Sequence, residues 1–156
     1  MEFTHIKGEK AKMVDVSEKS EALRTAVAEG FIRLKKRTIE AILKNEVAKG
    51  NVIAVANVAG VIAVKKTPEI IPMCHQIPIT SVDFNFEILE DGIRVVCTVK
   101  AIAKTGVEME ALNGVAVALL TIWDMVKSLE KDETGNYPET SIERIVVLKK
   151  TKQSQS

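Results

Sequence analysis

The residues best suited to chemistry in this chain lie in one apolar segment, Glu108 to Leu129, whose pattern predicts a long helix. Glu110 stands in its first turn and Asp124 stands near its end. Asp124 lies between two large apolar residues, where an unpartnered carboxylate is costly. Lys127, at the i+3 position, can supply the partner, so we expect an ion pair here that is either an ordinary surface pair or part of a site.

The two carboxylates of this helix cannot serve one small ligand within one subunit. Glu110 and Asp124 are 14 positions apart, which places them within about 40° on one helix face but about 21 Å apart along the axis. Either only one of them is functional, or a site joins the start of one helix to the end of another subunit's helix. We favour the second alternative, because the helix is apolar on nearly every side and one layer of helices cannot bury all of it. Gly114 and Ala118 have the small-residue spacing that permits a close approach between helices.

A second candidate region is the segment Ile71-Pro72-Met73-Cys74-His75. Pro72 favours a fixed loop, which raises the chance that His75 takes part in binding or proton transfer. Cys74 and Cys97 are far apart with no metal-type spacing, so we expect two reduced thiols in a cytoplasmic protein and no metal site. We interpret Cys74 as a pocket wall and not a nucleophile.

Three elements of the chain have clear local signals. Thr105 to Glu108 fits a capping box for the long helix, so Glu108 is assigned to capping first and to substrate second. Asn51 to Lys66 is apolar and too long for a typical strand, which predicts a helix with Asn51 as its N-cap. Ile79 to Leu89 alternates as a strand does, and Asp91-Gly92 predicts a hairpin into a second strand.

The remaining elements complete the expected architecture. Ser20 to Lys36 fits a helix in its first half and a strand in its second, so periodicity leaves it open. We expect a short helix over Thr38 to Ala48 and a last strand over Ile142 to Leu148. This order predicts a single α+β domain over residues 1–156, an antiparallel sheet with helices packed on one face. Its core spans about 13–148, and 1–12 and 149–156 are expected to be flexible tails.

Composition excludes several function classes. The formal net charge is +1 and aromatic residues make up 4% of the chain, which argues against nucleic acid as a partner. No signal peptide is visible at the start, and polar residues interrupt the apolar stretches, so no membrane association is expected.

Five motifs in order carry a specific resemblance. The chain resembles the molybdenum-cofactor biosynthesis protein C family, the cyclic pyranopterin monophosphate synthases, from about Met13 to Leu148. The most specific part is the run Thr105 to Leu112. The motifs are Met13-Val14-Asp15-Val16-Ser17, Lys49-Gly50-Asn51-Val52, Ile71-Pro72-Met73-Cys74-His75, Lys104-Thr105-Gly106-Val107-Glu108-Met109-Glu110-Ala111-Leu112 and Leu120-Thr121-Ile122-Trp123-Asp124-Met125-Val126-Lys127.

The resemblance implies a fold, an assembly and a reaction. The fold is ferredoxin-like, the assembly is a homohexamer built as a trimer of dimers, and Ser20 to Lys36 becomes largely extended. The reaction converts (8S)-3′,8-cyclo-7,8-dihydroguanosine 5′-triphosphate to cyclic pyranopterin monophosphate with release of pyrophosphate. No cofactor is required, although Mg²⁺ is compatible with a triphosphate substrate.

The resemblance also implies roles for individual residues. Asp124 is the catalytic residue, with Lys127 and Lys49 assisting, since fixed cations stabilise the charge that develops as pyrophosphate leaves. Arg24 is a further candidate cation. Lys65 or Lys66 is another, although we interpret this pair first as solvated lysines that favour the end of an apolar helix. The substrate-binding set is Met73, Cys74, His75, Met109, Glu110, Glu108 and Arg24, with Glu110 accepting hydrogen bonds from N–H groups of the ring.

The chain also departs from the family pattern. Asn51, Met73, Gln76 and Trp123 replace the usual Asp, Leu, Pro and Tyr. The usual Gly-Gly-Lys-Ser-Gly tail is missing, which leaves Lys149 or Lys150 as the candidate substitute for its lysine. The alternative function is a non-enzymatic oligomeric ligand-binding module of ferredoxin-like fold.

Overall fold

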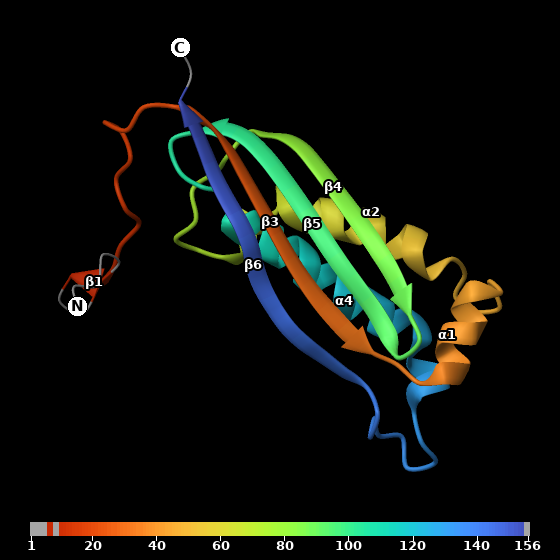
Figure 1. Ribbon diagram of the computed structural model, residues 1–156. Helices are drawn as coiled ribbons and strands as arrows, with labels where there is room; N and C mark the ends of the chain where they lie inside the picture. The colour runs from red at the N-terminus through yellow and green to blue at the C-terminus, as the bar shows by residue number, and fades with distance from the viewer. Residues whose placement is uncertain (1–5, 8–9, 155–156) are drawn as a thin grey trace.

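The computed structural model of the chain describes residues 6–7 and 10–154. Its main sheet has four antiparallel strands in the order β4-β5-β3-β6, and the helices lie on one face of this sheet (Figure 1). The strands are β3 (Ala22–Arg33), β4 (Ile79–Leu89), β5 (Gly92–Ala103) and β6 (Ser141–Ser154). The helices are α1 (Lys36–Leu43), α2 (Val52–Lys65), α3 (Thr67–Ile70) and α4 (Glu108–Glu130). A small ladder, β1 (Ile6–Lys7) with β2 (Lys10–Ala11), precedes them. This is the β-α-β-β-α-β order of the predicted α+β, ferredoxin-like fold.

Strand β3 is extended over its whole length, which settles the element that periodicity left open. It is a central strand, paired with β5 on one side and β6 on the other. Its residues alternate between buried and half-buried, because one face packs on the helices and the other is covered only in part. Gly30 permits a close approach to α4, since a Cβ at this position would lie 2.7 Å from Leu119 Cδ1.

Helix α2 begins as predicted. The Asn51 side chain accepts a hydrogen bond from the Ala54 amide at 3.0 Å, which satisfies one of the free N–H groups of the first turn. Gly60 lets the helix approach β4, because a Cβ there would lie 2.4 Å from Phe84 Cζ. Gly114 of α4 plays the same part toward α2, with Val64 as its nearest neighbour. The close approach predicted at Gly114 therefore occurs within the chain.

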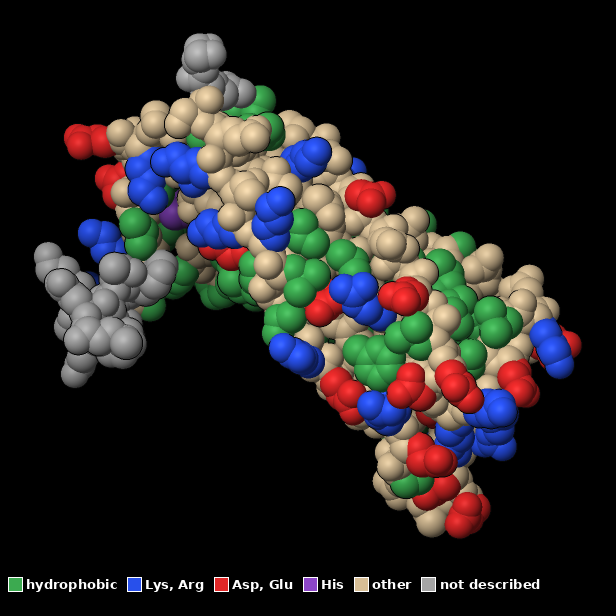
Figure 2. Space-filling model, in the orientation of Figure 1, with side chains coloured by type: hydrophobic (Ala, Val, Ile, Leu, Met, Phe, Trp, Pro, Cys, Tyr) green, Lys and Arg blue, Asp and Glu red, His purple; other side chains and the backbone are tan. Residues whose placement is uncertain are grey.

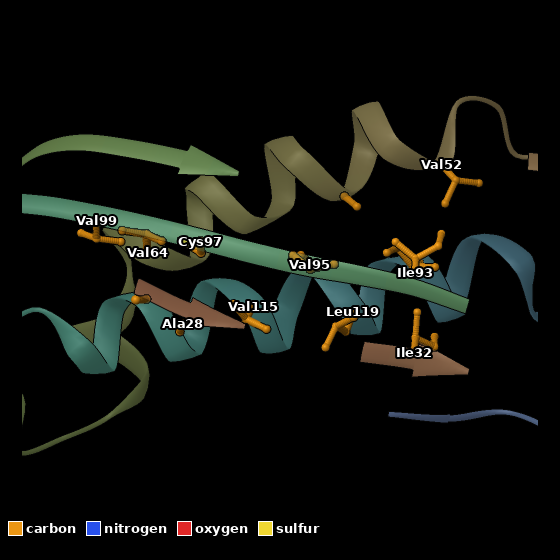
Figure 3. Packing of buried hydrophobic residues seen from close by; sticks show 14 of the residues in the cluster. Ala28, Ile32, Val52, Val64, Ile93, Val95, Cys97, Val99, Val115 and Leu119 are labelled. Atoms are coloured by element: carbon orange, nitrogen blue, oxygen red, sulfur yellow. The ribbon is translucent and has the colours of Figure 1, made fainter. Parts of the chain in front are cut away.

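The core fills the space between the sheet and helices α2 and α4 (Figure 3). Helix α4 is long and apolar enough to cross a membrane by length and composition alone. Half of its most apolar window is buried inside the structure, and it packs on α2 and the sheet, so we interpret it as the core helix. Labelled core residues in the figure are Ala28, Ile32, Val52, Val64, Ile93, Val95, Cys97, Val99, Val115 and Leu119.

The end of α4 is tied to the start of α1 by a fully buried carboxylate. Glu130 accepts hydrogen bonds from the Lys35 amide at 3.1 Å, from the Thr140 hydroxyl at 2.6 Å and from the Thr38 hydroxyl. The side chain of Lys35, the N-cap residue of α1, forms no capping hydrogen bond. Glu130 instead accepts a hydrogen bond at this end of the helix.

Three elements differ from the predictions. Helix α1 runs from Lys36 to Leu43 and ends five residues before the expected Ala48. The capping box predicted at α4 is wrong: Val107 is the N-cap, and no side-chain hydrogen bond caps this end among the described residues. The Glu108 carboxylate instead lies 3.2 Å from Lys150 Nζ. Strand β6 continues past Leu148 to Ser154, because its last residues pair with the first residues of β3. The tail lysines therefore occupy fixed positions on a strand.

Candidate active site at the two ends of helix α4

A cavity of about 550 Å³ lies at the start of α4. Three segments form its walls: residues 14–19 of the N-terminal arm, the loop of residues 71–77, and residues 105–110. Six of the predicted site residues line it together. These residues are Met73, Cys74, His75, Met109, Glu110 and Glu108.

Glu110 is the least solvated titratable group of this cavity. The residue is 2% exposed, and no side chain in the described part of the chain forms a hydrogen bond or ion pair with its carboxylate. Burial raises the pKa of Glu110, and the nearby charge of Glu108 adds to that rise, while a backbone hydrogen bond opposes it. A buried carboxylate that faces a cavity in this way is suited to accept hydrogen bonds from a ligand.

Glu108 is balanced by a lysine from the C-terminal strand. Lys150 Nζ lies 3.2 Å from Glu108 Oε1, while Glu108 Oε2 is buried and has no partner among the described residues. Of the two tail lysines considered from sequence, Lys150 is therefore the one that this structure places at the cavity residues.

His75 and Cys74 belong to the wall formed by the loop of residues 71–77. His75 Nε2 lies 2.6 Å from the Val14 carbonyl oxygen. Because a carbonyl only accepts, Nε2 must carry the proton, and Nδ1 of the neutral ring is then the acceptor. Burial raises the pKa of the Cys74 thiol, with further contributions from Glu110 and Glu108. A thiol that is reluctant to ionise fits the prediction of a pocket wall.

A second group of charged residues lies at the other end of α4. Asp124 Oδ2 lies 3.0 Å from Lys49 Nζ, and Asp124 Oδ1 lies 3.3 Å from Lys127 Nζ. Lys49 also donates to the Asp124 carbonyl oxygen at 3.1 Å. Hydrogen bonds from Lys49 and then Lys127 lower the pKa of Asp124. The expected ion pair between Asp124 and Lys127 is confirmed. Lys49, from the loop that precedes α2, forms a second ion pair with Asp124.

The two groups remain apart within one chain. Glu110 and Asp124 stand on the same helix, about 21 Å apart by helix geometry. Arg24 joins neither group. It is 8% exposed and donates to the carbonyl oxygens of Ala103 (3.3 Å) and Lys104 (3.1 Å). In this chain Arg24 therefore supports the turn that leads into α4, and its assignment to substrate stays a prediction.

The structure adds residues that the sequence reasoning did not place at the site. Val14, Val16 and Lys19 line the cavity from the N-terminal arm, although the motif around Val14 was the signal that could have indicated them. In the part of the chain that the structure describes, no group of three or more His, Cys, Asp or Glu side chains is arranged to hold a metal ion.

Comparisons with known proteins agree on one family. The MoaC family profile matches residues 13–153. A protein of Archaeoglobus fulgidus is 71% identical over 152 residues, covering 97% of each chain. A protein of Methanosarcina acetivorans is 61% identical over 150 residues, covering 96% of this chain and 95% of the relative. One of Pyrococcus furiosus is 56% identical over 156 residues, covering 100% of both. Each of these relatives is named a probable cyclic pyranopterin monophosphate synthase.

Proposed function

The chain belongs to the MoaC family, and from that premise we propose that it is a lyase of molybdenum cofactor biosynthesis, a cyclic pyranopterin monophosphate synthase. Its substrate is (8S)-3′,8-cyclo-7,8-dihydroguanosine 5′-triphosphate, and its products are cyclic pyranopterin monophosphate and pyrophosphate. Two free thiols, Cys74 and Cys97, are compatible with a cytoplasmic enzyme.

The observation that carries the proposal is the pairing of two chemically different groups on one helix. The cavity at the start of α4 offers the buried Glu110 as an acceptor for ring N–H groups. The other end offers Lys49 and Lys127 around Asp124, and fixed ammonium groups suit a pyrophosphate leaving group. A ligand-binding module would need the first group only, so the second group favours the enzyme.

The lowered pKa of Asp124 bears on its role in that reaction. A carboxylate held between two lysines is a weak general base near neutral pH, because it gains little by taking up a proton. We therefore assign it the positioning of Lys49 and Lys127, whose ammonium groups contact phosphate oxygens and can donate protons as the ring rearranges.

The assembly is part of the proposal. Val55, Val58 and Ile62 of α2 expose apolar side chains at helical spacing, and Leu120 of α4 is 58% exposed. Apolar helix faces of this kind are typical of subunit interfaces. We propose a homohexamer, a trimer of dimers, in which the Glu110 end of one subunit's α4 meets the Asp124 end of a neighbour's.

The activity is tested by incubating the purified protein with the cyclic dihydroguanosine triphosphate and measuring pyrophosphate and the pterin product. We expect both products in equal amounts. Parallel reactions with added Mg²⁺ and with EDTA determine whether a metal accompanies the triphosphate. Tight substrate binding without pyrophosphate release would support the ligand-binding module in place of the enzyme.

The composite site is tested by mixing two variants of strongly reduced activity, Glu110→Gln and Asp124→Asn. In a two-fold dimer each mixed pair has one site with both defects and one site with neither. Subunit exchange at equal amounts should therefore restore about a quarter of the wild-type activity, since half of the pairs are mixed. If both residues served a site within one chain, mixing would restore no activity.

A further inference from the structure

One wall of the cavity is an arm with no regular secondary structure. Residues 13–20, which we call the strap, lie between β2 and β3 in the chain and contribute Val14, Val16 and Lys19 to the cavity lining. A turn shapes the strap from within, because Asp15 Oδ1 accepts hydrogen bonds from the amide and hydroxyl of Ser17. The Lys19 amide closes the next turn on the Val16 carbonyl at 3.0 Å.

Two side chains from the other walls hold the strap by its backbone. His75 donates to the Val14 carbonyl oxygen at 2.6 Å, and Lys104 Nζ donates to the Ser17 carbonyl oxygen at 3.1 Å. His75 belongs to the loop of residues 71–77, and Lys104 directly precedes the segment that leads into α4. The strap is therefore fastened to both of the walls that it faces.

Lys19 is the one Lys or Arg among the described residues that line the cavity. The two carboxylates of the lining, Glu108 and Glu110, repel a polyphosphate. The nearby lysines are already engaged, Lys150 with Glu108 and Lys104 with the strap backbone. Lys19 forms no ion pair within the described chain and is exposed, so its ammonium group can move toward an anion. Figure 2 shows Lys and Arg side chains gathered at the end of the molecule where the N-terminal arm leaves the sheet.

We propose that Lys19 is a substrate-binding residue that contacts the triphosphate, and that His75 and Lys104 position it by holding the strap at the cavity. The inference rests on the proposed function for the identity of the ligand. The cavity then offers two kinds of contact: the buried Glu110 accepts hydrogen bonds from the ring, and Lys19 of the strap adds a cation for the phosphates to those proposed at Lys49 and Lys127. The contact is a charge-assisted hydrogen bond, made both before and during the reaction.

The test compares Lys19→Met with Lys12→Met in turnover assays on the cyclic dihydroguanosine triphosphate. Lys12 is a matched control, because it is exposed in the same arm but does not line the cavity. We expect KM to rise about tenfold in Lys19→Met with little change in kcat, and no change in Lys12→Met. Lys19→Arg should restore most of the lost affinity. A KM in Lys19→Met equal to that of Lys12→Met would overturn the inference.

A second measurement addresses the positioning role. Lys104→Met should speed amide hydrogen exchange in residues 13–20 and raise KM, whereas exchange in β5 should stay unchanged. Inorganic tripolyphosphate should slow exchange in the wild-type strap and fail to do so in Lys19→Met. Equal slowing in both proteins would contradict the phosphate contact.

The two proposals fail in different ways. If the wild-type protein binds the nucleotide but does not turn it over, the proposed function fails, and dissociation constants of Lys19→Met and Lys12→Met still decide the role of Lys19. If the wild-type protein neither binds nor turns over this nucleotide, both are overturned.

Discussion

The substitution Glu110→Gln tests two effects of the buried carboxylate: it lowers folding stability, and it contributes to binding of the ring. Glu110 is 2% exposed, and its pKa is raised mainly by burial, so its ionised form is disfavoured in the folded chain. The glutamine has nearly the same shape, cannot ionise and keeps one acceptor oxygen. The variant should therefore fold more stably at neutral pH while binding the ring less well.

The sign of the pH dependence follows from the direction of the pKa shift. A carboxyl group whose pKa is higher in the folded than in the unfolded chain holds more protons in the folded state, so folding stability falls as pH rises through that interval. Below the unfolded pKa of about 4.3 both states are protonated and the penalty is absent. Above the folded pKa the penalty is complete, and the glutamine variant escapes it.

The expected changes in stability and in kcat/KM follow from typical free energies of buried polar groups and of charged hydrogen bonds. Removal of a buried charge that has no side-chain partner should raise the free energy of unfolding at neutral pH by about 1–2 kcal/mol. That corresponds to a rise in Tm of roughly 2–8 °C for a chain of this size. Loss of a charged acceptor should lower kcat/KM by about 10- to 100-fold, because such hydrogen bonds contribute about 1.5–3 kcal/mol.

The assay is urea unfolding at constant protein concentration from pH 4 upward, together with steady-state kinetics at neutral pH. Constant concentration matters because an oligomer's stability depends on it. Glu108→Gln is the control: it loses the ion pair with Lys150, so it should gain no stability at neutral pH. A stability difference between Glu110→Gln and wild type that stays the same at every pH would refute the reasoning.

Three further substitutions test the fold and the second charged group. Glu130→Gln should lower the free energy of unfolding by about 1–3 kcal/mol in urea melts, since three donors lose a buried charged acceptor; an unchanged midpoint would contradict this. Gly60→Ala should cost about 1–3 kcal/mol, because the added methyl meets the Phe84 ring at 2.4 Å, and a thermal melt at or above the wild-type Tm would disprove the clash. Asp124→Asn should lower kcat about 100-fold while leaving the melting curve nearly unchanged, since the ion pairs it breaks are exposed.

The elements that were predictable from sequence are those whose signal is local. The Asp91-Gly92 hairpin and the Asn51 cap depend on residues next to each other in the chain, and both are present in the structure. Strand β3 could not be decided from its own pattern, because its apolar residues follow a helical spacing in the first half and alternate in the second. The missing information was that two other strands pair with it.

The capping box failed for the same reason. Thr105 and Glu108 have the right spacing, but strand β6 brings Lys150 to within 3.2 Å of the Glu108 carboxylate from 42 residues away. An ammonium group competes well with a backbone amide for a carboxylate. Lys19 could not be assigned to the site from sequence for a similar reason. An exposed lysine in a polar segment has no local pattern that indicates the cavity it lines.

Each half of the proposed composite site is formed by residues of a single chain. Lys49 and Lys127 hold Asp124 from the same chain, and the strap, the loop of residues 71–77 and Glu110 form the cavity within one chain. Each half of the site is thus preorganised before any subunits meet. Because α4 is a continuous helix, its length fixes the two halves about 21 Å apart, so neither half can adjust toward the other within one chain. Assembly then only has to bring the two halves together, without reshaping either of them. For this reason we assign the apolar outer face of α2 and α4, and not a charged loop, to the contact with the neighbouring subunit.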